Sequence, residues 1–186
     1  MMSSWIISLL FLTHASWAAL PSQVTGIDLT TGAAAQVSLI TSSGKASIVV
    51  FLSAKCPCSQ SHEVTLANLA KEFGPQGFRF VGVHSNSDES SELSIAHFKS
   101  SALPFPVVQD QSSQLATAFG ALKTPHVFVL QKGELVFSGG VDNSKTSSNA
   151  NQHYLRLALE KISEGKLPEV REVRTLGCVI QRKESP

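Results

Sequence analysis

The stretch Ser47 to Ser53 (SIVVFLS) is an unbroken apolar run rich in β-branched residues, and it leads almost directly into Cys56-Pro57. Such a run is typical of a strand that is covered on both faces of a sheet. From Pro57 to Phe73 apolar residues recur at helical spacing, and a proline suits the first turn of a helix because its missing N–H would have no partner there. The sequence therefore predicts a buried strand that turns directly into a helix.

The rest of the chain continues this alternation. Gly74-Pro75 is expected to end the first helix, Asp110 to cap a later one and Gly165 to stop the last, while Gln131-Lys132-Gly133 indicates a hairpin. Alternating strands and helices predict the α/β class, with a central mixed sheet flanked by helices. The expected further elements are strands at 78–83, 107–108, 127–130 and 134–137 and helices at 91–101, 110–119 and 155–162.

Composition limits the partners of the chain. Its 186 residues fit one domain, and 42% hydrophobic and 16% charged residues are typical of a globular protein. The formal net charge is +1, and Lys and Arg form no block anywhere in the sequence. Nucleic acid is therefore not an expected partner, because phosphate binding depends on clustered basic side chains.

The first residues have the pattern of a secretory signal peptide. Ile6 to Leu12 is a short apolar run, and Ser16 and Ala18 place small residues where a signal peptidase cleaves, although the usual basic start is missing. The run is too short to span a bilayer comfortably, so stable membrane insertion is not expected. We expect residues 1–18 to be removed, residues 19–186 to form the folded domain, and the protein to be exported to the periplasm or secreted.

Cys56 has the surroundings of a reactive thiol. It follows a predicted buried strand and precedes the helix that Pro57 opens, so unpaired N–H groups and the positive end of the helix dipole favour its thiolate. Lys55 adds a neighbouring positive charge. The alternative is that Cys56 is a small buried apolar residue, which is the commonest fate of a free cysteine.

Cys58 falls in the first helical turn, and His62 lies four residues further along the same face. Together with Cys56 these side chains could hold a soft metal ion, or His62 could simply lie at the solvent edge of the helix. Because a fourth ligand is missing, we expect no metal. A disulfide between Cys56 and Cys58 would close a very small ring around a proline and is expected to be strained.

Several segments together resemble one protein family. They are VVFLSAKCP, VHSNSD, PFPVVQDQSSQLATAFGALKTPHVFVL, LVFSGGVDNS, and EGKLP followed by LGCVI. In order and spacing they are similar to the thioredoxin-fold redoxin family related to alkyl hydroperoxide reductase and thiol-specific antioxidant proteins. They resemble most a branch with a Cys-Pro pair and a C-terminal Gly-Cys-x-Ile motif, which implies a thioredoxin-like domain over residues 19–186.

The resemblance implies roles for particular residues. Cys56 would be the attacking thiol, and Pro57, Thr124 and Pro125 would contact the substrate, with a cis peptide bond before Pro125 that presents backbone to an extended chain. From the sequence alone the Thr124-Pro125 bond would be expected to be trans, as most X-Pro bonds are.

The chain departs from the two-cysteine thioredoxin motif, because the position three after Cys56 is Ser59. Cys58 or Cys178, the cysteine of the Gly-Cys-x-Ile motif, must then supply the second thiol. The resemblance favours a bridge from Cys178 to the Cys-Pro-Cys segment. Cys58 is the preferred partner in a structural bridge, and a catalytic Cys56–Cys178 pair is the alternative.

The expected function is that of an exported thiol–disulfide oxidoreductase, which acts on a protein disulfide with a separate redox partner and needs no cofactor. A thiol peroxidase of the peroxiredoxin type is the second candidate. That family places proline and threonine where this chain has Val49 and Ser53, and it needs an arginine, yet none occurs between Arg79 and Arg156. Third come a copper chaperone using Cys56, Cys58 and His62 or His126, and a binding module without catalysis.

Overall fold

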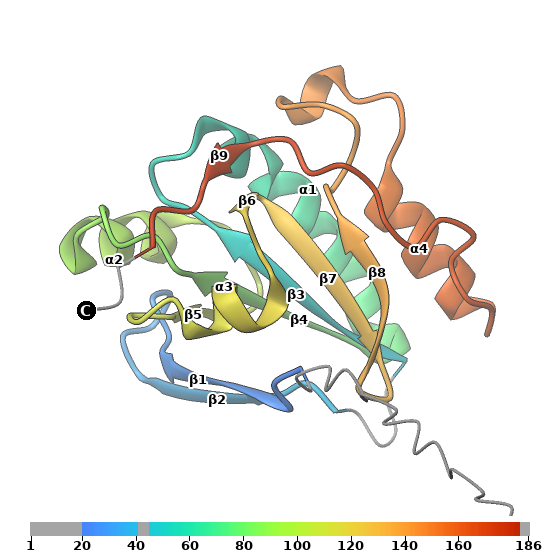
Figure 1. Ribbon diagram of the computed structural model, residues 1–186, viewed down its shortest axis with the longest axis horizontal. Helices are drawn as coiled ribbons and strands as arrows, with labels where there is room; N and C mark the ends of the chain where they lie inside the picture. Colours follow the sequence, from blue (N-terminus) through green and yellow to red (C-terminus); the bar gives the residue numbers. More distant parts are fainter. Residues whose placement is uncertain (1–19, 41–44, 183–186) are drawn as a thin grey trace, which may run out of the picture.

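The computed structural model describes residues 20–40 and 45–182, so the expected signal peptide at 1–18 lies outside the described residues. Its centre is a five-stranded sheet in the order β5-β4-β3-β7-β8 (Figure 1). Strand β3 (Ala46–Leu52) is buried at every residue and pairs in parallel with β4 (Phe78–His84) and antiparallel with β7 (His126–Gln131). Strands β5 (Val107–Gln109) and β8 (Glu134–Gly139) complete a mixed sheet.

Each face of the sheet is covered by a different set of elements, because side chains alternate along β3. Ile48 and Val50 point into one apolar layer, where α1 (Pro57–Phe73), α2 (Ser91–Ser100) and α4 (Tyr154–Ser163) pack. Val49 and Phe51 point to the other, where α3 (Gln114–Phe119) packs together with the hairpin of β1 (Gln23–Ile27) and β2 (Ala34–Ser38). This is a thioredoxin-like fold, and the predicted α/β class with a central mixed sheet flanked by helices is confirmed.

The helices predicted from apolar spacing are present, but one predicted cap is wrong. Asp110 was expected at the start of α3, whereas Ser113 occupies the N-cap position with a φ of 54°. The Asp110 carboxylate instead accepts hydrogen bonds from the Ser85 hydroxyl at 2.8 Å and the Ala116 N–H at 3.0 Å. Three residues separate Asp110 from the start of α3, so its carboxylate binds the first turn of the helix from outside the helix.

Two short strand pairings had no counterpart in the sequence analysis. They are the β1–β2 hairpin and the pairing of β6 (Lys123–Thr124) with β9 (Cys178–Val179). The chain after α4 runs back over the top of the sheet in Figure 1, so that β9 lies against β6 beside the start of α1. The single-turn helices η1 (Gly74–Gln76) and η2 (Ser147–Asn149) complete the described elements.

None of the helices within the described residues is long and apolar enough to cross a bilayer.

Candidate active site

Cys56 is the N-cap residue of α1 and is almost completely buried. Its backbone N–H donates to the Ser53 hydroxyl at 3.0 Å, which fixes the turn between β3 and α1. Its sulfur accepts the Ser59 N–H at 3.4 Å, and its S–H donates to the Thr124 carbonyl oxygen at 3.2 Å. The thiol therefore lies on the unpaired N–H groups of a 17-residue helix, as the sequence predicted.

The environment of Cys56 favours its thiolate. Burial alone raises the pKa of this thiol, but hydrogen bonding from Cys178, from Thr124 and from the Ser59 N–H outweighs burial and brings the pKa below its ordinary value of 9.0. The buried Thr124 hydroxyl has no hydrogen-bond partner within the described part of the chain, which leaves its proton available to the Cys56 sulfur. A thiolate at Cys56 is the nucleophilic form of the residue.

Lys55 does not have the expected role. Its ammonium group is exposed and donates to the Asp88 carbonyl oxygen at 2.8 Å, and it is not among the groups that lower the pKa of Cys56. The Ser59 N–H at the helix start, the Thr124 hydroxyl and the Cys178 thiol, rather than a lysine, lower the pKa of this cysteine.

The Thr124-Pro125 peptide bond is cis. The trans bond expected from general X-Pro statistics is therefore wrong, and the cis bond implied by the family resemblance is confirmed. Both residues are buried, and the Thr124 carbonyl oxygen faces the sulfur of Cys56.

Cys178 reaches the same site from the far end of the chain. In the β6–β9 pair Thr124 lies opposite Cys178, and the Ile180 N–H donates to the Leu122 carbonyl oxygen at 3.0 Å. The Ile180 side chain is buried in the apolar layer that contains α3. Gly177 has a φ of 152°, and a Cβ atom there would overlap the Thr124 carbonyl oxygen, so only glycine fits this close approach.

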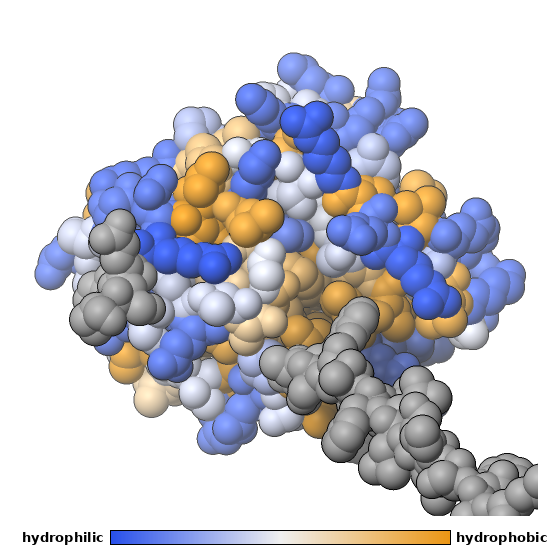
Figure 2. Space-filling model, in the orientation of Figure 1, coloured by the Kyte–Doolittle hydropathy of each residue, from blue (hydrophilic) through white to orange (hydrophobic). Residues whose placement is uncertain are grey.

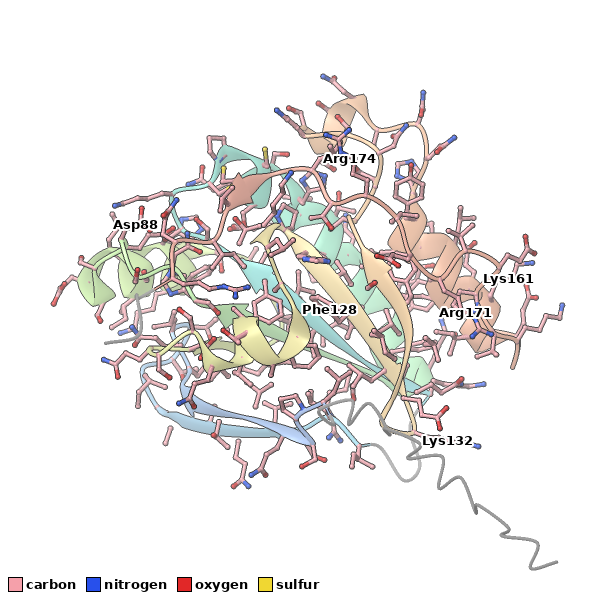
Figure 3. All side chains as sticks on the ribbon, in the orientation of Figure 1. Asp88, Phe128, Lys132, Lys161, Arg171 and Arg174 are labelled. Carbon is pink, nitrogen blue, oxygen red and sulfur yellow. The ribbon has the colours of Figure 1, made fainter. Side chains whose placement is uncertain are left out.

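The three cysteines form one cluster. The sulfur atoms of Cys56, Cys58 and Cys178 all lie within 4.8 Å of one another, and all three residues are free thiols. Sulfur atoms, yellow in Figure 3, are visible where α1 begins beside β9. The structure thus brings together the three predicted catalytic cysteines with Pro57, Thr124 and Pro125.

Charge in this cluster concentrates on one sulfur. Burial, then the neighbouring Cys56, raises the pKa of Cys58. The same two causes raise the pKa of Cys178 to about 12. Cys56 is therefore the first of the three to lose its proton, and Cys58 and Cys178 stay protonated and can donate hydrogen bonds to its sulfur.

His62 is neither at the solvent edge nor available as a metal ligand, so both sequence-based interpretations are wrong. It is buried, with Nδ1 2.6 Å from the Cys58 carbonyl oxygen and Nε2 3.1 Å from a carboxylate oxygen of Asp142. The ring links α1 to the loop after β8. His126, the other histidine considered, accepts the Leu122 N–H, and burial lowers its pKa to about 4.

A buried network behind the cysteines was missed in the sequence. Glu89, which follows β4, accepts the Ala54 N–H at 2.8 Å and the Ser53 hydroxyl proton, and lies 3.1 Å from Nε2 of His84. Burial raises the pKa of Glu89, but the hydrogen bonds with His84, Ser53 and Ala54 bring it below its ordinary value of 4.5. Glu89 thereby holds the turn that carries Cys56. Only its place in the polar segment after a buried strand could have pointed to it.

Comparisons with known proteins concern the family and the fold of the chain. The sequence profile of the AhpC/TSA family matches residues 21–138. A search of curated protein sequences gives no match.

Solved structures show the same fold along most of the chain. An uncharacterized conserved protein from Geobacillus kaustophilus is 24% identical with a TM-score of 0.77, and the similarity covers 88% of this chain and 90% of that one. A hypothetical protein from Sinorhizobium meliloti is 25% identical with a TM-score of 0.75, covering 90% and 95%. The exposed lipoprotein thioredoxin of Streptococcus pneumoniae is 20% identical with a TM-score of 0.55, covering 66% and 92%.

Proposed function

The chain belongs to the AhpC/TSA family, and we propose that within this family it is a thiol–disulfide oxidoreductase whose nucleophile is Cys56. The observation that carries the proposal is the contrast between the cysteines. Cys56 alone combines a lowered pKa with a helix N-terminus and a neighbouring cis-proline, while the pKa values of Cys58 and Cys178 are raised.

The proposed cycle transfers two electrons. The Cys56 thiolate attacks one sulfur of a substrate disulfide, the S–S bond breaks, and the departing sulfur leaves as a thiolate that takes up a proton. The second thiol then loses its proton and attacks the Cys56 sulfur. This step releases the second substrate thiol and leaves an internal disulfide, which a dithiol partner reduces.

We propose that Cys178 is the second thiol. It lies opposite Thr124, whose carbonyl oxygen faces Cys56, and its thiol makes the largest contribution that lowers the pKa of Cys56. Cys58 lies across a proline in a three-residue ring, where disulfide geometry is harder to reach. This choice favours the catalytic Cys56–Cys178 pair over the structural Cys58–Cys178 bridge that the sequence analysis preferred.

The C-terminal strand β9 limits the ways in which a substrate can reach Cys56. The backbone of Thr124, expected to meet an extended substrate, is paired with Cys178 of the same chain. A substrate would then reach Cys56 across Pro57, which is exposed, or by displacing β9. Leu122 and Val179 are also exposed, and apolar surface is visible beside β9 in Figure 2.

Peroxide reduction stays the second candidate and has less support. The Ser53 hydroxyl, which would replace the peroxidase threonine, accepts the Cys56 N–H and donates to Glu89. Arg79 donates to the Ser38 carbonyl oxygen, and Arg156 is paired with Glu72. These groups are thus engaged away from the thiol, and a peroxide would lack the preorganised donors that stabilise its transition state.

The test is the reduction of insulin disulfides by the full chain with dithiothreitol as the electron source. Cys56→Ser should abolish the activity, Cys178→Ser should stop the cycle at a mixed disulfide, and Cys58→Ser should keep most of the rate. Full activity of Cys56→Ser would overturn the proposal. Rapid consumption of hydrogen peroxide, faster than that of an ordinary low-pKa thiol, would favour the peroxidase instead.

A further inference from the structure

The cluster contains one more thiol than the proposed redox cycle uses. A disulfide between Cys56 and Cys178 consumes two sulfurs, yet the sulfur of Cys58 lies within 4.8 Å of both. Among the residues that the structure describes, these three form the one group of three or more side chains with metal-ligand atoms gathered this closely. The third thiol therefore calls for a role outside thiol–disulfide exchange.

The geometry points to a metal site: we propose that the reduced protein binds one Cu(I) ion through the sulfurs of Cys56, Cys58 and Cys178. This departs from the sequence-based expectation of no metal, and it replaces His62 of the earlier copper interpretation with Cys178. A three-coordinate ion with metal–sulfur bonds of about 2.3 Å needs sulfurs about 4 Å apart, so the observed cluster needs little adjustment.

The backbone holds the three ligands in place. Cys56 is the N-cap of α1, Cys58 lies in the first turn of the same helix, and Cys178 is fixed by the β6–β9 pairing. The buried Ile180 anchors the strand that carries Cys178. A site with ligands from a helix start and a paired strand is largely preformed, which lowers the conformational entropy lost on binding.

The chemistry of the available ligands favours Cu(I) over other metal ions. His62 on α1 and Asp142 on the loop after β8 are hydrogen-bonded to each other, and Glu89 accepts hydrogen bonds from Ser53 and Ala54. Among the described residues the site therefore offers three sulfurs and no free nitrogen or carboxylate ligand. Structural zinc sites take four protein ligands, whereas soft thiolates without a fourth ligand suit Cu(I).

The local charge is also compatible with bound thiolates. All three sulfurs lie at the N-terminal end of a 17-residue helix that has no acidic residue in its first turn. The positive end of the helix dipole there offsets part of the negative charge of a thiolate–Cu(I) complex. A disulfide between Cys56 and Cys178 would remove two ligands, so copper binding and the oxidised state exclude each other.

The experiment titrates the reduced full chain with Cu(I) under anaerobic conditions against the chromophoric chelator bathocuproine disulfonate. One equivalent should be retained per chain. Cys56→Ser, Cys58→Ser and Cys178→Ser should each weaken binding on the order of 100-fold, since even the loss of an outer-shell partner costs about 10–100-fold. His153→Ala, which removes an exposed histidine at the start of α4, serves as the control and should bind like the wild type.

X-ray absorption at the copper edge should show three sulfur neighbours, and the oxidised protein should retain no copper. Unchanged affinity in Cys58→Ser, a two-sulfur spectrum, or equal binding by oxidised protein would overturn the three-thiol site. The result is independent of the proposed redox function, because Cys58→Ser should lose copper while it still reduces insulin. If the protein fails to bind copper, the copper site is refuted but the insulin assay still tests the redox function. If the protein fails to reduce insulin, the redox function is refuted but the copper titration still tests the metal site.

Discussion

The lowered pKa of Cys56 depends on neighbours that lie far from it in the sequence. Burial works against its thiolate, and three hydrogen-bond donors, from Cys178, Thr124 and Ser59, reverse that effect. Of these donors only the Ser59 N–H belongs to the helix start that the sequence predicts. The cysteine that the sequence singled out is the one whose pKa is lowered, but the sequence attributed part of this effect to Lys55, whose ammonium group instead donates to the Asp88 carbonyl oxygen.

This account predicts that Cys178 tunes Cys56. Cys178→Ala removes the thiol that lowers the pKa of Cys56 most strongly, so the Cys56 pKa should rise. Cys178→Ser keeps a hydrogen-bond donor and should shift it less. The rate of iodoacetamide alkylation at Cys56, followed against pH with peptide mapping, measures both. A Cys56 pKa in Cys178→Ala at or below that of the wild type would refute this interpretation.

Glu89 should stabilise the folded state in a pH-dependent way. Its pKa lies below 4.5 in the folded protein, so its contribution is present above that pH and is lost as the pH falls through the folded-state pKa. Glu89→Gln should lower the free energy of unfolding by about 1–3 kcal/mol at pH 7, because it weakens bonds to Ser53, Ala54 and His84.

Urea denaturation at several pH values checks this prediction. The difference between wild type and Glu89→Gln should shrink below about pH 4.5. Glu134→Gln, at an exposed position of β8, is the matched control and should change little. A difference that stays constant with pH would show that the carboxylate charge is not the stabilising feature.

At the scale of elements, the sequence predicted those with a strong local pattern. β3 and α1 combine an unbroken apolar run with helical spacing, and both were found within one residue of their predicted ends. β6 and β9 have two residues each, and their pairing depends on contacts between segments more than fifty residues apart. Such short pairings give no periodic pattern of apolar residues, so this pattern could not predict that β9 lies beside the candidate active site.

The β6–β9 pairing should be sensitive to Gly177. Gly177→Ala would force a methyl group into the Thr124 carbonyl, so β9 should separate from β6 and carry Cys178 away from Cys56. The rate of air oxidation to an internal disulfide should then fall on the order of tenfold or more, which corresponds to a rise of about 1.4 kcal/mol in the activation free energy. Thiol titration over time measures it.

Gly74→Ala is a suitable control for that experiment, because a Cβ atom there meets nothing within 4 Å and its φ is helical. It should oxidise like the wild type. Equal oxidation rates for Gly177→Ala and the control would mean that the close approach of Gly177 does not hold Cys178 in place.

At the scale of the whole molecule, the central sheet and its two helical layers could be predicted from the sequence. The packing of the N-terminal hairpin and of the C-terminal segment could not. The five central strands follow from alternating apolar segments, and the two layers follow from the alternation along β3. The cis bond before Pro125 came only from the family resemblance, since local sequence favours trans. The N-terminal hairpin and the C-terminal segment pack on this frame through side chains such as Val24 and Ile180, whose partners are distant in the sequence.

Export is a further proposal at this scale, based on the pattern of residues 1–18. Expression of the full chain in a bacterial host should yield a mature protein that begins at Ala19 outside the cytoplasm. N-terminal sequencing of fractionated cells checks this, and an intact Met1 in the cytoplasm would contradict it.

The central claim is that Cys56 and Cys178 form the redox pair, and disulfide mapping tests it most directly. The full chain is oxidised by insulin under turnover, quenched with acid, unfolded and alkylated with N-ethylmaleimide near neutral pH, digested without reduction and analysed by mass spectrometry. The account predicts one cross-linked peptide that joins Cys56 to Cys178, with Cys58 alkylated. A bridge between Cys56 and Cys58, a bridge between Cys58 and Cys178, or three alkylated cysteines would contradict it.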